Sequence, residues 1–467
     1  MAQVTILGAG ICGLAAGMLL ARDGHEVTLL ERDPDPVPAS AAGAWEAWSR
    51  GGVAQFRQPH FLQAAGRELL EQELPDVVDA LAAAGALRFD VLSIMPPTIA
   101  DRSARPGDER LRTVTARRPV LEHVLARAAE AQPGLEVRRG VGVAGLVAGA
   151  CDGIAHVTGV RTEAGEEVGG DLVVDAMGRG SPLPRWVRDV AGAPMHEEAE
   201  DSGFVYYTRF FRAGADGMPR FRSAPLTPIG TLTVLVLPSD DDTWSVTLFG
   251  AAADRPLKRV RFRERWEAVL AACPAHAQWL GEPISDVLPM GGLADRYRRL
   301  TVDGRPLVTG VALLGDACAC TNPSVGRGMT LGLLHARDLR DAVRALDAPA
   351  AFAAAWDEVT EAHLIPWYRD TVNGDRARLR EIDALRAGEP PPRPPGPLAE
   401  VLAALPAATT HDPDIFRAFV QTRACYATLA EVLARPGVAE RIVEVGGAHE
   451  AQAPPGPDRE QLLALLG

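Results

Sequence analysis

The chain has 467 residues, of which 47% are hydrophobic and 23% charged, and its formal net charge is −13. This length exceeds one ordinary core and predicts two or three packed units. The acidic balance excludes a nucleic-acid partner, which would need a basic face. Charged residues interrupt every apolar run before the roughly 18 residues that a membrane helix needs. We therefore expect a globular, cytoplasmic protein without a membrane span.

The first elements in chain order are an apolar strand, QVTIL, a glycine turn, a helix and a second strand, EVTLLE. Gly8 permits the tight turn, Gly10 lets backbone approach a pyrophosphate, and Gly13 lets the helix pack on the strand. Glu31 ends the second strand, where a carboxylate accepts hydrogen bonds from ribose hydroxyls. The pattern predicts a dinucleotide site, and we include Arg32, the next residue, among its candidate ligands.

The middle and end of the chain have different patterns. Residues 109–185 predict an amphipathic helix, a hairpin and another apolar strand. Between 201 and 250 the stretches FVYYTRFFR, GTLTVLVLP and TWSVTLFG alternate as antiparallel strands do. Beyond residue 346 the chain reads as helical, interrupted by GEPPPRPPGP, which is typical of a linker or surface loop. The six cysteines lack the short repeated spacings of a metal or disulfide site, so we expect no metal.

Three motifs stand in a fixed order: the glycine turn with Glu31, then DLVVDAMGRGSPLPRW, then GVALLGDACACTNPSVGRGM. Together they resemble the FAD-dependent monooxygenases of the para-hydroxybenzoate hydroxylase fold, over roughly residues 1–345. That superfamily also holds epoxidases, geranylgeranyl reductases and flavin halogenases. The resemblance implies an α/β fold with a Rossmann-like FAD-binding domain built from discontinuous segments, an antiparallel β-sheet substrate domain and a helical C-terminal region. The expected segments are 1–75, 109–185 and 296–345 for FAD, 76–108 and 186–295 for substrate, and 346–467 for the C-terminal region.

The late motif implies most of the remaining cofactor contacts. By the resemblance, Asp316 follows the tight turn at Gly315 and places a carboxylate on the ribityl chain of FAD. The loop that opens the next helix is expected to face the isoalloxazine through Pro323, Gly326, Arg327, Gly328 and Met329. A helix N-terminus there stabilises negative charge on reduced flavin. Arg118 matches the family arginine that contacts FAD, with Arg117 as the competing choice. Cys318 and Cys320 are expected to be packing residues.

The middle motif departs from the monooxygenase pattern, because Met177 stands where the hydroxylase branch has an aspartate. In that branch the aspartate helps to bind both FAD and the nicotinamide cofactor. NADPH or NADH is therefore expected as electron donor either directly or through a separate flavin reductase. Halogenation is disfavoured, because the chain's one lysine, Lys258, is far from the expected position and no W-x-W-x-I-P stretch exists.

The resemblance implies oxygenation, in which reduced flavin and molecular oxygen give a C4a-hydroperoxide that hydroxylates or epoxidises an electron-rich substrate. The protein then has to position a small, largely apolar, natural-product-type substrate and exclude water. The alternatives are a flavin-dependent reductase or dehydrogenase acting on an isoprenoid or polyene, and a non-catalytic flavin-binding protein.

Candidate substrate residues come from two places. Tyr206 and Phe210 share one face of the strand FVYYTRFFR by its period of two and are expected to face the flavin, with ordinary sheet packing as the alternative. Arg57 and His60, in QFRQPHF, are expected to contact flavin or substrate, or else to satisfy their own loop. His60 is also the histidine proposed to handle protons.

Overall fold

A parallel sheet of five strands forms the nucleotide-binding layer, and it is assembled from separate stretches of the chain. The structure, a computed structural model, describes residues 1–345, 348–393, 396, 398–450 and 452–467. The strand order is β21-β9-β1-β2-β5, with every neighbouring pair parallel. The bounds are β1 Gln3–Leu7, β2 Glu26–Glu31, β5 Leu135–Arg139, β9 Leu172–Asp175 and β21 Val311–Leu313. The expected α/β class with a discontinuous Rossmann-like domain is confirmed.

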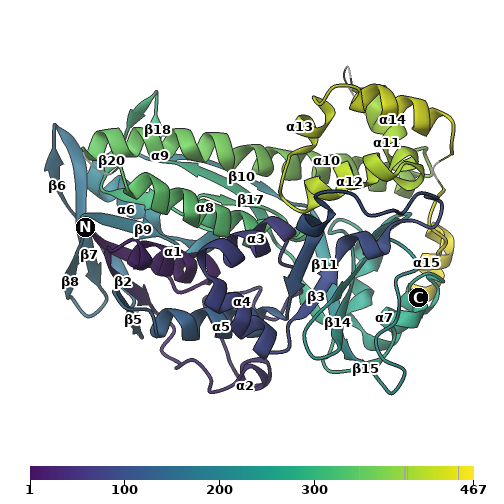
Figure 1. Cartoon of the computed structure of the whole chain (residues 1–467), viewed down its shortest axis with the longest axis horizontal. Coiled ribbons are helices and arrows are strands. Elements are labelled where there is room, and N and C mark those ends of the chain that lie inside the picture. Colours follow the sequence, from purple (N-terminus) through teal and green to yellow (C-terminus); the bar gives the residue numbers. More distant parts are fainter. Residues whose placement is uncertain (346–347, 394–395, 397, 451) are drawn as a thin grey trace.

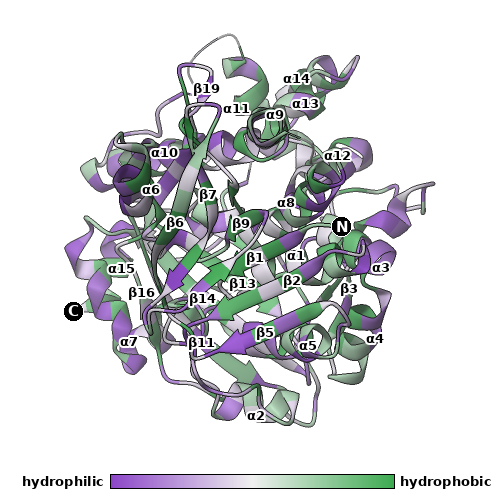
Figure 2. Cartoon of the chain, turned by 90° about the vertical axis from the view of Figure 1, so that its left-hand side faces the viewer, coloured by the Kyte–Doolittle hydropathy of each residue, from purple (hydrophilic) through white to green (hydrophobic). Residues whose placement is uncertain are grey.

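Both faces of this sheet are covered, which explains why its central strands are continuously apolar. On one face, Val4 and Ile6 share a core cluster with α1, α5 and α8; on the other, Leu7 and Val173 pack with β7 and α6. Figure 2 shows the contrast between apolar β2 and the more polar edge strand β5. The covering elements are α1 Ile11–Arg22, α5 Arg118–Glu130, α6 Leu183–Ala191, α8 Gly328–Val343, β6 Val143–Cys151, β7 Ile154–Thr162 and β8 Glu167–Gly169.

The second layer is an antiparallel sheet in the order β12-β13-β14-β11-β15, with β16 also paired to β11. Trp244, Trp266 and Trp279 pack between one face of this sheet and α7. The predicted hairpin through SDDD is confirmed by the β13–β14 pairing. The bounds are β11 Phe204–Arg212, β12 Leu226–Ile229, β13 Leu232–Pro238, β14 Thr243–Ala251, β15 Glu282–Pro283, β16 Leu288–Met290 and α7 Arg263–Ala271.

A small sheet in the order β10-β17-β22 lies between the two layers (Figure 1), and several other elements of the first 346 residues are short. The bounds are β10 His196–Asp201, β17 Ala294–Arg299, β22 Ala319–Cys320, β18 Thr301–Val302, β19 Arg305–Pro306, β20 Val308–Thr309 and α2 Ala41–Glu46.

The C-terminal region is helical, as expected, and it is spread over both layers. In Figure 1, α9 and α10 run along the molecule from the parallel sheet to the antiparallel one, and α15 returns to α7. Among the described residues, no helix is long and apolar enough to cross a membrane. GEPPPRPPGP falls partly outside the described residues. The helices are α9 Pro349–His363, α10 Ile365–Ala387, α11 Ala399–His411, α12 Pro413–Arg423, α13 Leu429–Leu433, α14 Val438–Gly447 and α15 Arg459–Leu466.

Core packing crosses two of the expected domain boundaries. The insertion does not begin at residue 76, because Val77 and Leu81 of α4 belong to the same core as α1 and α5. A break after residue 185 would cut α6, whose Trp186 and Val187 pack with the parallel sheet. The elements around the first boundary are α3 Ala64–Glu73, α4 Pro75–Ala83, β3 Leu87–Asp90 and β4 Arg112–Thr115.

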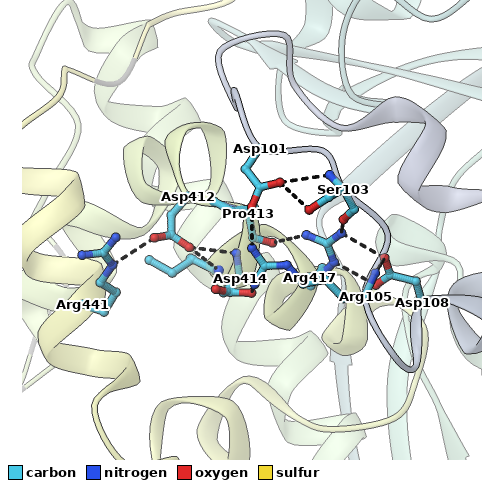
Figure 3. Close-up of polar contacts among 10 residues, drawn as sticks. Asp101, Ser103, Arg105, Asp108, Asp412, Pro413, Asp414, Arg417 and Arg441 are labelled. Atoms are coloured by element: carbon cyan, nitrogen blue, oxygen red, sulfur yellow. Dashed lines mark hydrogen bonds and ion pairs between the residues drawn. The ribbon is translucent and has the colours of Figure 1, made fainter.

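The connection between β3 and β4 is fastened to α12 by a cluster of charged side chains (Figure 3). Arg417 donates to both oxygens of Asp108, at 2.8 and 2.9 Å, and to the carbonyl of Ser103 at 2.9 Å. Arg105 pairs with Asp414 at the start of α12. This cluster of ion pairs, called the α12 clamp below, joins residues 101–108 to the C-terminal region rather than to the antiparallel sheet.

Candidate functional site

One cavity of about 390 Å³ lies where the carboxyl ends of β1 and β2 meet the open face of the antiparallel sheet. Ligands of open α/β sheets bind at this edge. The cavity has a nucleotide end, lined by the glycine turn and charged side chains, and a sheet wall, lined by uncharged side chains. The sheet wall consists of Tyr206, Thr208, Leu235, Leu237, Thr247, Met290 and Leu293.

The glycine turn has the geometry that its spacing predicts. Gly8 has a φ of +100°, and a Cβ there would lie 2.8 Å from the carbonyl oxygen of Ala176. A Cβ on Gly13 would lie 2.0 Å from the carbonyl oxygen of Gly8, so only glycine allows this close packing. A Cβ on Gly10 would meet nothing within 4 Å, and this residue lines the cavity at the N-terminus of α1. A ligand can therefore approach the backbone at Gly10.

Glu31 lines the nucleotide end with its carboxylate fixed by three donors. It accepts hydrogen bonds from the backbone N–H groups of Ala9 and Asp33, both at 2.9 Å, and from Nη2 of Arg50 at 2.6 Å. Arg50 is 5% exposed and also pairs with Asp33 and with fully buried Glu122. No sequence motif marks this arginine, because its three carboxylate partners come from β2, the following loop and α5.

Arg117 and Arg118, the two candidate arginines, point in different directions. Arg118 lines the cavity, donating from Nε to Glu122 at 2.7 Å and from Nη1 to Nε2 of His60 at 2.8 Å. Arg117 points to the β13–β14 turn, where it pairs with buried Asp240 at 2.5 Å. Glu122 therefore lies between Arg118 and Arg50 and holds both guanidinium groups in place.

His60 lines the cavity, and its surroundings disfavour protonation of the imidazole near neutral pH. Nδ1 donates to the carbonyl of Gln58 at 2.9 Å, and Nε2 accepts from Arg118. Burial and the Arg118 guanidinium lower the pKa of His60 to about 3. The imidazole is therefore neutral at physiological pH and acts as an acceptor that orients Arg118.

The late motif brings most of its candidates to the cavity. The lining includes Asp316, Pro323, Gly326, Gly328 and Met329, together with Arg32 and Arg179. Burial raises the pKa of Asp316, while Arg118 and Arg179 counteract that rise. Gly315 turns the chain with a φ of +56° behind the lining, where a Cβ would lie 3.0 Å from Sγ of Cys12.

The side chain of Arg327 points away from the cavity, so a contact of this residue with the flavin would have to come from its backbone. It pairs with Asp370 of α10 at 2.5 Å and donates to the carbonyl of Thr422 at 3.1 Å. Its guanidinium also lies 5.0 Å from the ring of Trp367. Arg327 therefore fastens the start of α8 to the C-terminal region.

Of the other substrate candidates, Tyr206 lines the cavity, whereas Phe210 and Arg57 do not. Phe210 packs on Trp45 with ring centroids 4.9 Å apart, beyond the sheet wall. Arg57 donates to the carbonyls of Trp45 and Trp48, and its guanidinium lies 5.1 Å from the Trp45 ring. Neither predicted substrate residue is therefore part of the cavity lining, because α2, which carries Trp45, occupies both side chains.

Cys318 and Cys320 are 3% and 7% exposed, and burial raises the pKa of both thiols. Cys318 packs in the core beside Tyr297 and Leu313, while Cys320 lines the cavity. These surroundings agree with packing roles for neutral thiols.

The nucleotide end fits FAD. The N-terminus of α1 is capped by a glycine, which has no side chain to occupy its N–H groups, so they remain available to a pyrophosphate. The guanidinium of Arg327, the N-cap of α8, is held elsewhere, so the N-terminus of α8 also faces the cavity through Gly328. Arg32 and Arg179 add positive charge, and Glu31 and Asp316 offer acceptors for hydroxyl groups.

Together the fold and this site define an FAD-dependent oxidoreductase. The family model described as FAD binding domain matches residues 1–346, so the chain belongs to this family, that of the FAD-dependent monooxygenases with the para-hydroxybenzoate hydroxylase type of fold.

Three similar proteins illustrate the family. Protein Rv3254 of Mycobacterium tuberculosis is 29% identical over 370 residues, 73% of each chain. Kynurenine 3-monooxygenase of Salinispora tropica is 27% identical over 386 residues, 77% of each chain. The structure of OxyS anhydrotetracycline hydroxylase from Streptomyces rimosus shares the fold with a TM-score of 0.54 and 21% identity, over 91% of this chain and 76% of that one.

Proposed function

We propose that the protein uses FAD and molecular oxygen to hydroxylate or epoxidise a neutral, largely apolar small molecule of natural-product type. The observation that carries this proposal is that one cavity joins a nucleotide end suited to FAD to an uncharged sheet wall. A substrate held against that wall would lie beside the flavin and away from bulk water.

FAD, when bound and reduced, supplies the activation of oxygen. The glycine turn and α1 would hold its pyrophosphate, and Glu31 and Asp316 its ribose and ribityl hydroxyls. The N-terminus of α8, from Gly328, would stabilise negative charge on the flavin ring through its N–H groups. Arg118, oriented by His60 and Glu122, would add a fixed positive charge at the junction with the sheet wall.

The uncharged sheet wall supports a neutral substrate rather than an amino acid such as kynurenine. Arg50 and Arg118, the buried cations of the lining, are already paired with Glu31, Asp33 and Glu122. An amino acid would have to bury its carboxylate and ammonium groups without partners at the wall, which is costly.

The polar anchor on the wall would be a pair of threonines. The hydroxyls of Thr208 and Thr247 lie 2.8 Å apart and bond each other. One hydroxyl donates within the pair, so the other retains a hydrogen for a substrate oxygen. This arrangement fits a carbonyl or hydroxyl group on an otherwise apolar molecule.

Because Met177 stands in place of the aspartate of the hydroxylase branch, two routes for the reduction of FAD remain. Its neighbour Asp175 does not replace the missing aspartate, because that carboxylate accepts from Ser181 Oγ at 2.5 Å and from the backbone of Met177 at 3.0 Å. NADPH or NADH would therefore reduce FAD either directly or through a separate flavin reductase. The same feature favours the second candidate, a flavin-dependent reductase or dehydrogenase acting on an isoprenoid or polyene.

The proposal is tested with FAD-loaded protein supplied with NADPH, with NADH, or with either plus a separate flavin reductase. Neutral phenols and alkenes are offered under ¹⁸O₂, with kynurenine as the charged comparison. Oxygen uptake with a product heavier by one ¹⁸O atom supports the monooxygenase. A product heavier by two hydrogens without oxygen uptake supports the reductase instead, and reduction without turnover of any compound leaves the non-catalytic flavin protein.

A further inference from the structure

A buried polar cluster lies behind the cavity wall, centred on Asn322. The hydroxyl of Tyr206, on the sheet wall, donates to Oδ1 of Asn322 at 2.7 Å. Nδ2 of Asn322 donates to Oδ2 of Asp375 at 3.0 Å, and its backbone N–H donates to Oδ1 of Asp295 at 2.5 Å. Every polar group of this asparagine side chain is thus engaged, and Asn322 itself is 1% exposed.

Asp375 belongs to α10, beyond the residues that match the family model. Its second oxygen, Oδ1, accepts from the hydroxyl of Ser324 at 2.7 Å. Asp375 therefore receives both Asn322 and Ser324 from one loop, residues 321–326, which also lines the cavity through Pro323 and Gly326. We call this stretch the flavin loop.

An ionised carboxylate suits this position because both groups that face it are donors. Among the described residues, the hydrogen-bond partners of Asp375 and Asp295 are uncharged. Burial raises the pKa of each to about 6. Keeping Asp375 charged near neutral pH therefore works against folding stability, and a geometric role explains its presence better than stabilisation does.

We propose that Asp375 is a positioning residue for the flavin site: it fixes the flavin loop through Asn322 and Ser324, and through Asn322 the Tyr206 hydroxyl. The helical C-terminal region thereby supplies part of the cofactor cradle. The inference rests on FAD binding, not on which substrate is oxygenated.

The direct test is Asp375→Asn, which keeps the shape of the side chain. One of the two donors, Asn322 Nδ2 or the Ser324 hydroxyl, then faces an N–H₂ group, which cannot accept its hydrogen bond. FAD binding is followed by the quenching of flavin fluorescence on titrating the apoprotein, and the visible spectrum of bound FAD is recorded. We expect FAD to bind about tenfold more weakly, as the loss of hydrogen bonds to a charged acceptor implies, with a shifted spectrum. The matched control, Asp383→Asn, changes an exposed aspartate of the same helix and leaves both readouts unchanged.

A swapped pair separates positioning from general damage. In Asn322→Asp/Asp375→Asn, the new carboxylate at 322 accepts from Tyr206 and from the amide at 375, whose oxygen accepts from Ser324. All three bonds are retained, so FAD affinity returns to within about threefold of wild type. If the single variant binds FAD like wild type with the same spectrum, or if the swap binds no better than Asp375→Asn, the inference is overturned.

Ser324→Ala keeps the test decisive if Asp375→Asn does not fold. It removes one of the two donors and leaves the charge in place, and we expect FAD to bind roughly threefold to fivefold more weakly with an unchanged melting temperature of the apoprotein. Unchanged FAD affinity in this variant would also contradict the inference. A protein that binds FAD in this manner yet oxygenates nothing would overturn the proposed function alone.

Discussion

The two ends of the cavity are built in different ways. The nucleotide end is made by backbone at a glycine turn and by a chain of buried ions, from Arg118 through Glu122 to Arg50 and Glu31, with neutral His60 bonded to Arg118. The sheet wall is made by uncharged side chains from β11, β13, β14 and β16 and from Leu293. One end therefore depends on close backbone approach, which local sequence spacing encodes, and on charge pairs between distant segments. The other end depends on surface shape, which only the assembled sheet encodes. Substitutions at the two ends should have separable effects on FAD and on substrate.

The largest effect is expected at Glu122, which is fully buried and serves both Arg50 and Arg118. Glu122→Gln leaves two buried guanidinium groups short of a charged partner and should lower the free energy of unfolding by about 4 kcal/mol. Chemical denaturation measures this loss. Glu130→Gln, at the exposed end of the same helix, is the control and should change stability little. A small effect at Glu122 would mean that the ion chain does not organise the nucleotide end.

The glycine turn allows stability and FAD binding to be separated. Gly13→Ala places a Cβ 2.0 Å from the Gly8 carbonyl oxygen and should lower stability by about 3 kcal/mol, with loss of FAD. Gly10→Ala meets no protein atom within 4 Å, so the apoprotein should melt like wild type while FAD binds at least about tenfold more weakly. Melting curves and flavin titrations check both variants. Gly145→Ala, also in open space, is the control. Normal FAD binding by Gly10→Ala would place the pyrophosphate elsewhere.

A smaller, pH-dependent effect is expected at Asp175, which is 0% exposed beside Met177. Burial raises its pKa to about 6, only partly offset by its bonds from Ser181 and the Met177 N–H. Between pH 4 and 6 the folded protein retains a proton that the unfolded chain releases, so this group's contribution to stability falls as the pH rises. Relative to wild type, Asp175→Asn should therefore gain stability from pH 4 to 6 and show no further change above. Denaturation midpoints measured across this range check the trend, and a constant difference would contradict it.

The smallest effect is expected at the sheet wall. Thr208→Val keeps the shape but removes one hydroxyl of the threonine pair, so the KM for an oxygenated substrate should rise about fivefold, in line with one lost hydrogen bond. FAD affinity should stay unchanged, because Thr208 lies outside the nucleotide end. Thr233→Val, on β13 of the same sheet and outside the cavity lining, is the control. A weaker affinity for FAD in Thr208→Val would show that the two ends are not independent.

The sequence predicted best what depends on local spacing. The α/β class, the glycine turn, the β13–β14 hairpin and the cavity-facing direction of Tyr206 all follow from periodicity and steric demands of glycine. Period two correctly placed Phe210 on the same face as Tyr206. It could not show that Trp45 of α2 covers the far end of that face.

The sequence could not reveal side-chain directions that distant segments decide. Arg327 lies in the expected loop, yet its guanidinium turns to Asp370, which lies 43 residues further along the chain. Arg50 carries no motif of its own, and its role appears only when β2 and α5 bring carboxylates to it. Asp375 likewise becomes part of the site only because α10 packs behind the flavin loop.

The α12 clamp has a consequence for the limits of the functional unit. A chain ending at residue 346 would retain every residue that matches the family model, but Asp108 would lose Arg417 and the apolar side chains of Met95 and Ile99 would lose Phe416 and Val420. Such a fragment would expose these apolar side chains to solvent and tend to aggregate. The family match thus ends inside a region that these contacts hold together, so we expect a chain cut at residue 346 to be less stable than the full chain.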